Sequence, residues 1–420
     1  MSLSTVALGG TGSAWSGIIV SIIVVFNALV LGELAARYPV SGGLYSYIKY
    51  LLPAPIAMIA VCLTLLQAVT FTPGIALGIG TYVQLLFPQI PQTPLMTSII
   101  SAIVLVFAVA LAIKDIGTSS KVSLVLLAIQ GVIVCIYIGA NFLQPQRSMG
   151  EILTNPVVLD GTGTLVPVGI GTILLAAGSC QGVINGYDAS LGFAEETKGR
   201  SINVAKAVII SAVCACAFIL VPIISSMIAA PDIAEYLRAP SPYLYTANAT
   251  LGSFGSVIIS LGIIVASFIG LVALNAYMAR VLYTTGRDEL WGNSINRFIT
   301  KVSPKSRSPW VASLIIAVVS MVLIFASSLV DLITFVGVLV ALVYVLIAVG
   351  VFLDRKKDPD GYRPFKMPLY PLPAIVVIIS LTAVICMQNL RDIGLSAVVC
   401  IIALAYYFIF IRPKKKRKTK

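Results

Sequence analysis

The sequence has no histidine among its 420 residues, and only 10% of its residues are charged. Histidine is the side chain that most often shuttles protons or binds metals near neutral pH, so both roles lack their usual residue here. Hydrophobic residues make up 59% of the chain, which is more than soluble domains contain. Little charge and long apolar runs together predict an all-α polytopic membrane protein.

The seven cysteines all fall in apolar runs and show neither metal-ligand spacing nor a secreted disulfide pattern. We interpret each as a small buried apolar residue. The sequence shows no nucleophile–base pair, no metal cluster and no phosphate-binding loop, and we expect no cofactor. The short glycine turn at 161–163 does not indicate a nucleotide site. These absences argue against an enzyme.

Eleven long apolar runs follow a glycine-containing start at 1–16. Each is close to or above the about 20 residues that a helix needs to cross a bilayer. The runs are 17–35, 54–86, 95–113, 122–142, 168–193, 202–229, 254–284, 310–327, 329–352, 369–387 and 395–411. The sequence therefore predicts eleven complete spans.

Basic residues are spread unevenly over the loops between these runs. If the run 17–35 ends inside and the runs alternate, only Arg147, Arg238 and Arg391 of the 28 Lys and Arg residues lie in outer loops. This positive-inside bias explains the net charge of +12 without a nucleic-acid partner, and it predicts a cytoplasmic C-terminus in the cell membrane. The basic tail 412–420 either anchors this topology or contacts anionic lipid headgroups.

Eleven runs with an internal C-terminus place residue 1 outside, whereas polytopic proteins more often have an even number of spans. We therefore interpret residues 1–16 as the end of an earlier span with its outer loop. On this interpretation, the true N-terminus lies upstream.

Glycine and polar residues interrupt the run 168–193, in the segment GSCQGVINGYDASLGFAEETK (178–198). Glycine costs about 1 kcal/mol of helix propensity relative to alanine. Asp188 lies about 10 Å of helix rise from the charged end of the segment, where a carboxylate needs a polar cavity or a partner. We predict a discontinuous helix, unwound near 183–186, that lines a solute site. The alternative is a glycine-rich packing face with Asp188 turned inward.

Of the sixteen acidic residues, only Asp188 lies well inside a run. Neutral polar residues at depth are further candidates for the site, although each is also explained by a hydrogen bond between helices. They are Gln67, Thr70, Thr72, Gln130 and Asn275. Pro73 would free a backbone carbonyl that cavity water or solute could satisfy.

Four segments resemble one family of transporters. GELAARYPVSGGLYSYI (32–48) follows the first run, and GYDASLGFAEETK (186–198) ends the interrupted run. NAYMARVLYTTGRDEL (275–290) ends the seventh run, and RPFKMPLYPLP (363–373) precedes the last two. Together these segments are similar to the amino acid/polyamine/organocation (APC) superfamily of permeases, and the resemblance covers nearly the whole chain.

The resemblance implies a LeuT-like transporter fold of five-plus-five inverted repeats, with the first and sixth spans broken at the midplane and two extra C-terminal helices. The run 17–35 is then the second span, and the interrupted run is the sixth. The chain divides into a remnant of the first span and outer loop, the transporter core of spans two to ten, an inner loop with two C-terminal spans, and a basic tail: 1–16, 17–353, 354–411 and 412–420.

The resemblance also implies residue roles. The substrate ammonium would meet the unwound turn of the sixth span, and side chains of other spans would shape the pocket. The substrate-binding candidates are Val183, Ile184, Asn185, Gly186, Asp188, Gln67, Thr70, Asn275 and Tyr344. The cytoplasmic gate would contain Tyr38, Ser41, Gly42, Gly43, Glu195 and Glu196. A plain turn also explains the Pro-x-Ser-Gly-Gly pattern of that inner loop.

Three departures from the family pattern affect the mechanism. The Gly-Ser-Gly motif that meets the substrate carboxylate is absent, so half of that site is missing from the sequence. Gly182 and Ile184 stand where members often carry gating aromatics. Gln130 stands nearest to a lysine that couples protons in some members. A neutral amide cannot carry that proton, so Asp188 or exchange of two solutes would have to serve.

The leading hypothesis is a secondary transporter for small amino acid or amine substrates, which works by alternating access with proton symport or exchange. A polyamine or organic-cation exchanger is the first alternative, because Asp188 could pair with a second ammonium. A truncated remnant or a non-transporting membrane subunit is the second, because the first half-helix is missing.

Overall fold

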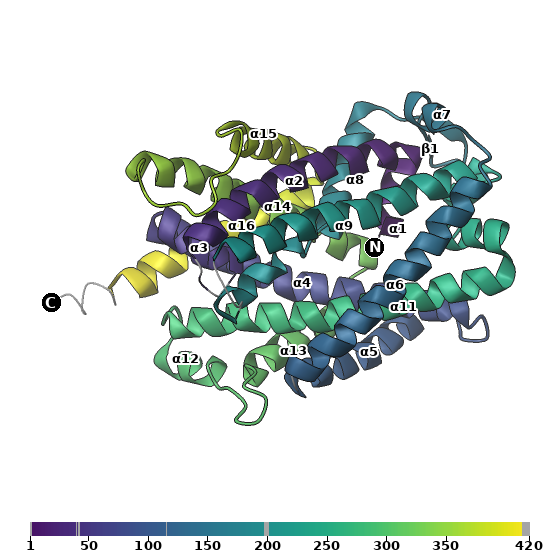
Figure 1. The fold of residues 1–420 in the computed structure, drawn as a ribbon. Helices are drawn as coiled ribbons and strands as arrows, with labels where there is room; N and C mark the ends of the chain where they lie inside the picture. Colours follow the sequence, from purple (N-terminus) through teal and green to yellow (C-terminus); the bar gives the residue numbers. More distant parts are fainter. Residues whose placement is uncertain (1, 39, 41–42, 115, 197–200, 414–420) are drawn as a thin grey trace.

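Figure 1 shows the computed structural model, which describes residues 2–38, 40, 43–114, 116–196 and 201–413. Long helices lie roughly along one axis and form a bundle. Only two short strands occur in the described part of the chain, β1 (Val157–Leu159) and β2 (Leu165–Pro167). The all-helical architecture predicted from composition is confirmed.

Eight helical segments of the described chain are long and apolar enough to cross a membrane. They are Thr5–Arg37, α4 (Ala54–Leu86), α5 (Pro94–Lys114), Leu124–Leu143 in α6 (Ile116–Leu143), α9 (Ile202–Ala229), α11 (Pro242–Arg287), α14 (Leu329–Lys357) and Leu390–Ile411, which joins α16 (Leu390–Tyr406) to η3 (Tyr407–Ile411). Two apolar helices are shorter, α13 (Trp310–Ala326) and α15 (Leu372–Cys386). These ten segments correspond to ten of the eleven predicted runs.

The eleventh run is not one helix. It is divided into α8 (Ile170–Val183) and the 3-10 helix η2 (Tyr187–Glu196). The expectation of eleven complete spans was therefore too high: eight helices have full length, two are shorter and one region is interrupted. A further difference is in α11, which begins at Pro242 and contains a kink at Gly252.

Helical structure begins before the apolar run 17–35. The helix α1 (Ser2–Gly9) leads through η1 (Gly10–Gly12) into α2 (Ser13–Arg37). Gly10 has φ +55°, and a Cβ there would meet the backbone of Val157, so only glycine suits this corner. The corner turns α1 against α8, where Thr5 Oγ1 lies 3.4 Å from Ser179 Oγ.

Short elements cover the two ends of the bundle. One end carries α7 (Met149–Thr154), α10 (Ile233–Arg238) and the hairpin β1–β2, in which Val157 pairs with Pro167. The glycine turn at 161–163 is the loop of this hairpin. The other end carries α3 (Gly43–Leu51), α12 (Asn293–Ile299) and the C-terminal end of α16 (Figure 1).

The helix α14 forms the centre of the packing, with contacts to α4, α8 and α15. Of its most apolar window, 72% is buried, whereas the share is 11% in α6 and in the α16 segment. A helix that is apolar on all sides but poorly buried needs lipid around it. The interior of the bundle is therefore built around α14, while α6 and α16 offer their outer surfaces to the bilayer.

Glycines allow α8 to approach α14 at the level of the backbone. A Cβ on Gly337 would collide with the carbonyl oxygen of Gly178, and one on Gly182 would lie 2.8 Å from the carbonyl oxygen of Ile333. This close contact matches the small-residue packing that joins helices in membranes. The glycine-rich packing face, which the sequence left as an alternative, thus describes Gly178 and Gly182.

Replacing Gly182 with alanine is expected to lower the free energy of unfolding by about 1–3 kcal/mol, because the added methyl overpacks the α8–α14 contact. The matched control is Gly171→Ala in the same helix, where a Cβ meets nothing within 4 Å. Thermal unfolding of the detergent-purified proteins measures both. Equal midpoints for the two variants would contradict the close backbone packing.

Candidate substrate site

The polypeptide leaves helical geometry at 184–186. The N–H of Ile184 donates to the carbonyl of Cys180, which ends α8, and Gly186 adopts φ +103° with open space at its Cβ position. Among the backbone hydrogen bonds of the described chain, none ends on the carbonyls of Val183, Ile184 or Asn185. These oxygens lie at the negative end of the α8 dipole, which suits a cationic group such as an ammonium.

A cavity of about 580 Å³ lies beside this break. Its walls come from α4, α6, α9 and α11 as well as from the break itself. Most of its lining is apolar, and the described residues that line it include no Asp, Glu, Lys or Arg. Its apolar walls include Phe71, Ile75, Ile133, Val134, Ala215, Phe218, Ile219, Ile263 and Leu274. Such a pocket, apolar with a few polar groups, is typical of small-molecule sites.

Four of the predicted residues line this cavity. Val183, Asn185 and Gly186 contribute from the break, and Gln130 contributes from α6. The other predicted binding residues are absent from the described lining. Ile184 is fully buried in the core instead.

Asp188 is buried, with 2% of its surface exposed, and it does not line the cavity. The Tyr344 hydroxyl and the backbone at Gly186 and Asp188 lie close enough to favour its charged form. The structure thus places Asp188 close to other groups of the protein and not among the described residues that line the cavity.

Tyrosine and asparagine side chains surround the same turn. Tyr344 Oη lies 3.3 Å from Asn185 Oδ1, and the Tyr344 ring lies 6.0 Å from that of Tyr187. Asn27 Nδ2 donates to Tyr187 Oη at 2.7 Å. Tyr344 therefore acts on the cavity through Asn185, which it helps to orient, and not by lining the wall.

The other predicted polar residues divide into two kinds. The hydroxyl of Thr70 donates to the carbonyl of Leu66 in its own helix at 2.8 Å, so its hydrogen-bonding is local. Gln67 and Asn275 are buried and carry amide atoms without a hydrogen-bond partner. Gln67 lies one turn from the cavity-lining Phe71 on α4, and Asn275 follows Leu274 on α11.

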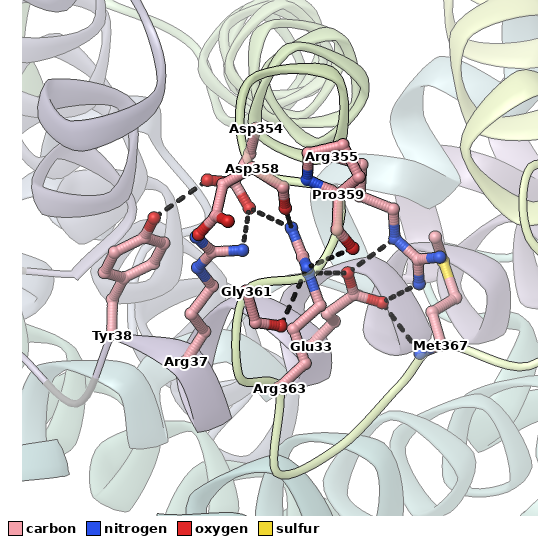
Figure 2. Close-up of polar contacts among 10 residues, drawn as sticks. All are labelled: Glu33, Arg37, Tyr38, Asp354, Arg355, Asp358, Pro359, Gly361, Arg363 and Met367. Atoms are coloured by element: carbon pink, nitrogen blue, oxygen red, sulfur yellow. Dashed lines mark hydrogen bonds and ion pairs between the residues drawn. The ribbon is translucent and has the colours of Figure 1, made fainter.

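A charged network occupies the end of the bundle that the sequence predicts to be cytoplasmic. Its first centre is Glu33 of α2, which is 1% exposed. Arg355 donates to both Glu33 oxygens, at 2.9 and 2.5 Å, and Arg363 Nε lies 3.3 Å from Oε1. The backbone N–H of Met367 donates to the same carboxylate at 2.7 Å (Figure 2).

The second centre is Asp354 of α14. Arg37 Nη1 and Arg363 Nη2 contact its Oδ2 at 2.9 and 3.1 Å, and the Tyr38 hydroxyl donates to its Oδ1 at 2.8 Å (Figure 2). Arg37 also pairs with Asp358 at 2.6 Å. Burial, together with this hydrogen bond, raises the pKa of Tyr38, so its hydroxyl stays protonated and donates.

Three carboxylates and three guanidiniums balance in this network, which joins the end of α2, the end of α14 and the segment between α14 and α15. Tyr38, a predicted gate residue, belongs to this network, which the sequence did not predict. The sequence features that could have indicated the network are Glu33 and Arg37 in the GELAARYP segment and Arg363 in the RPFKMP segment. Their pairing could not be inferred from the sequence, because more than 300 residues separate Glu33 from Arg355 and Arg363.

Of the remaining predicted gate residues, only Gly43 has a described side-chain environment. Gly43 lies in the described chain, where a Cβ would collide with the ring of Tyr277. Ser41 and Gly42 lie outside the described residues, as do the side chains of Glu195 and Glu196. Their gate role stays a prediction.

The profile of the amino acid permease family matches residues 1–411. The chain belongs to this family. The resemblance found in the sequence segments is thereby confirmed, and with it the class of the protein: a multi-pass membrane transporter and not an enzyme.

Several characterised relatives cover most of the chain. The branched-chain amino acid permease BcaP of Bacillus subtilis (strain 168) is 24% identical over 97% of this chain and 89% of its own length. The low-affinity putrescine importer PlaP of Escherichia coli (strain K12) is 23% identical over 80% of this chain and 72% of its own length. A methylthioribose transporter of Bacillus subtilis (strain 168) is 23% identical over 89% of this chain and 80% of its own length.

Replacing Glu33 with glutamine is expected to lower the free energy of unfolding by about 3–5 kcal/mol, because it removes a buried carboxylate from its pairs with the half-buried Arg355 and the buried Arg363. The matched control is Asp331→Asn, since Asp331 is 55% exposed and lies 3.9 Å from an exposed Arg391. That variant should lose about 1 kcal/mol or less. Denaturant unfolding in detergent measures both, and equal losses would show that the network adds nothing beyond a surface pair.

Proposed function

We propose that this permease carries neutral amino acids with apolar side chains across the cell membrane by alternating access. The observation that carries the proposal is the position of the break. Val183 and Asn185, whose carbonyls accept no backbone hydrogen bond in the described chain, line a cavity that is otherwise mostly apolar and has no charged residue in its described lining. An amino acid needs both features, because its ammonium requires oxygen acceptors and its aliphatic side chain requires a dry wall.

The relatives bind chemically different substrates, so the family alone does not select one. The name of BcaP specifies branched-chain amino acids, and that of PlaP specifies putrescine. The uncharged lining favours the first class for this chain. A diamine would bring a second ammonium into the cavity, and no described carboxylate lines it.

A polyamine or organic-cation exchanger remains the second candidate, and Asp188 is the residue that favours it. This case is weakened because Asp188 is absent from the described cavity lining and because Tyr344 and the backbone at the break already favour its charged form. A second ammonium would have to replace partners that the carboxylate already has. We therefore assign Asp188 first to holding the shape of the break and to coupling, and only second to binding substrate.

The substrate proposal predicts that leucine competes with uptake of a labelled branched-chain amino acid, whereas putrescine at the same concentration does not. The measurement is uptake into vesicles that contain the purified protein. Competition by putrescine equal to that of leucine would overturn the apolar assignment. If the vesicles take up neither the labelled amino acid nor putrescine, the result favours the non-transporting alternative.

A pair of glycine variants connects this uptake to the cavity. Gly270 lines the cavity and has open space at its Cβ position, so Gly270→Leu should fill part of it. Leucine uptake is expected to fall by about tenfold or more, the effect of one or two misplaced methylenes in an apolar pocket. Gly139→Leu is the control, because Gly139 is equally open but does not line the cavity.

Coupling can be tested at Asp188. Gln130 lines the cavity but is a neutral amide, which leaves Asp188 as the deeply placed titratable carboxylate. If transport is coupled to protons, Asp188→Asn is expected to abolish its pH dependence while Asp331→Asn retains it. The measurement is the initial uptake rate across the pH range. A parental pH profile in Asp188→Asn would exclude Asp188 as the coupling group and favour solute exchange.

A further inference from the structure

The segment 293–310 joins α11 to α13 at the end of the bundle that also holds α3 and the end of α16 (Figure 1). It consists of α12 and the loop that leads into α13. The helices α11 and α13 are both apolar helices of the bundle. The segment between them is therefore connected to the membrane at both of its ends. Neither the candidate site nor the charged network uses any of its residues.

The helix α12 is apolar on a face that points away from the protein. It buries Asn296 and Ile299, whereas Ile295 is 55% exposed and Phe298 is 50% exposed. Val302, in the loop that follows α12, is 40% exposed. Side chains three or four residues apart lie on one face of a helix, so Ile295 and Phe298 form a continuous apolar surface that the protein leaves uncovered.

Basic side chains surround this apolar surface. Arg297, Lys301, Lys305 and Arg307 are all exposed, and none of these four forms an ion pair within the described chain. Lys301 Nζ lies 5.3 Å from the centre of the Phe298 ring, which brings charge and apolar surface together. The acidic residue Asp288 is near in sequence, but it pairs with Lys49 at 2.8 Å.

We propose that the segment 293–310 docks on the surface of anionic phospholipids. An exposed apolar face bordered by cations is the pattern of interfacial helices, in which apolar side chains enter the headgroup boundary and basic ones meet lipid charge. The partly exposed Trp310 at the start of α13 fits this depth, because indole rings favour the interface. The membrane is the favoured occupant because the segment is connected to it at both ends.

The experiment compares two tryptophans with equal exposure, Trp310 in the segment and Trp15 at the other end of the bundle, each 37% exposed. One protein keeps only Trp310 (Trp15→Phe and Trp291→Phe), and the other keeps only Trp15. Both are placed in vesicles of equal amounts of anionic and zwitterionic phospholipid. Two vesicle preparations are compared, one in which the anionic lipid is brominated and one in which the zwitterionic lipid is brominated. Bromine quenches tryptophan fluorescence on contact, so each preparation reports which lipid lies next to the tryptophan.

Trp310 is expected to be quenched more strongly by the brominated anionic lipid, whereas Trp15 responds equally to both. Neutralising the four cations to glutamine (R297Q, K301Q, K305Q and R307Q) should remove the bias of Trp310. Each charge contributes up to about fivefold, which corresponds to the about 1 kcal/mol of a basic side chain at an anionic surface. Raising the salt concentration should weaken the bias in the parent protein.

Three results would overturn the proposal. Equal quenching of Trp310 by both lipids would show that the segment does not select anionic lipid. A bias that persists in the four-fold variant would assign it to other cations, such as those of the tail 412–420. No quenching by either lipid would mean that the segment faces water or another protein. The unchanged response of Trp15 in the four-fold variant confirms that the variant is folded and inserted.

Discussion

In the interior of a bilayer, an unpaired backbone carbonyl has no water to bind, so a break in a helix is stable only beside a cavity or a polar partner. This constraint organises the centre of the permease. Val183, Asn185 and Gly186 of the break line the cavity, and the Tyr344 hydroxyl donates to Asn185 Oδ1 at the same turn. The packing of α8 on α14, through Gly178, Gly182 and Gly337, then fixes where the break lies.

Charge is distributed along the molecule in a way that complements this centre. The described cavity lining is uncharged, whereas three carboxylates and three guanidiniums are collected at one end of the bundle. Buried ion pairs do little for net stability compared with apolar packing, but they tolerate no missing partner. The network therefore specifies how the ends of α2 and α14 meet, whereas the polar residues in the described cavity lining, such as Gln130 and Asn185, are neutral.

The glycine-rich segment shows why sequence reasoning reached the correct region but not every role. A glycine is equally compatible with a helix break and with close helix packing. The structure assigns the first role to Gly186, with its positive φ, and the second to Gly178 and Gly182. Similarly, a buried amide such as Gln67 and a hydroxyl such as Thr70 look alike as candidates, yet Thr70 bonds to its own helix and Gln67 has an unpaired oxygen.

The sequence by itself determined the membrane class, the positions of ten apolar helices, the interruption near 183–186 and the family, because these follow from local composition and from continuous motifs. Only the tertiary structure decided which residues face the cavity, how Asp188 is held and that Glu33 meets Arg355 and Arg363. Helical periodicity normally indicates which face of a helix is buried. These helices are apolar on all sides, so that signal is weak, and contacts between distant segments arise only when the bundle is packed.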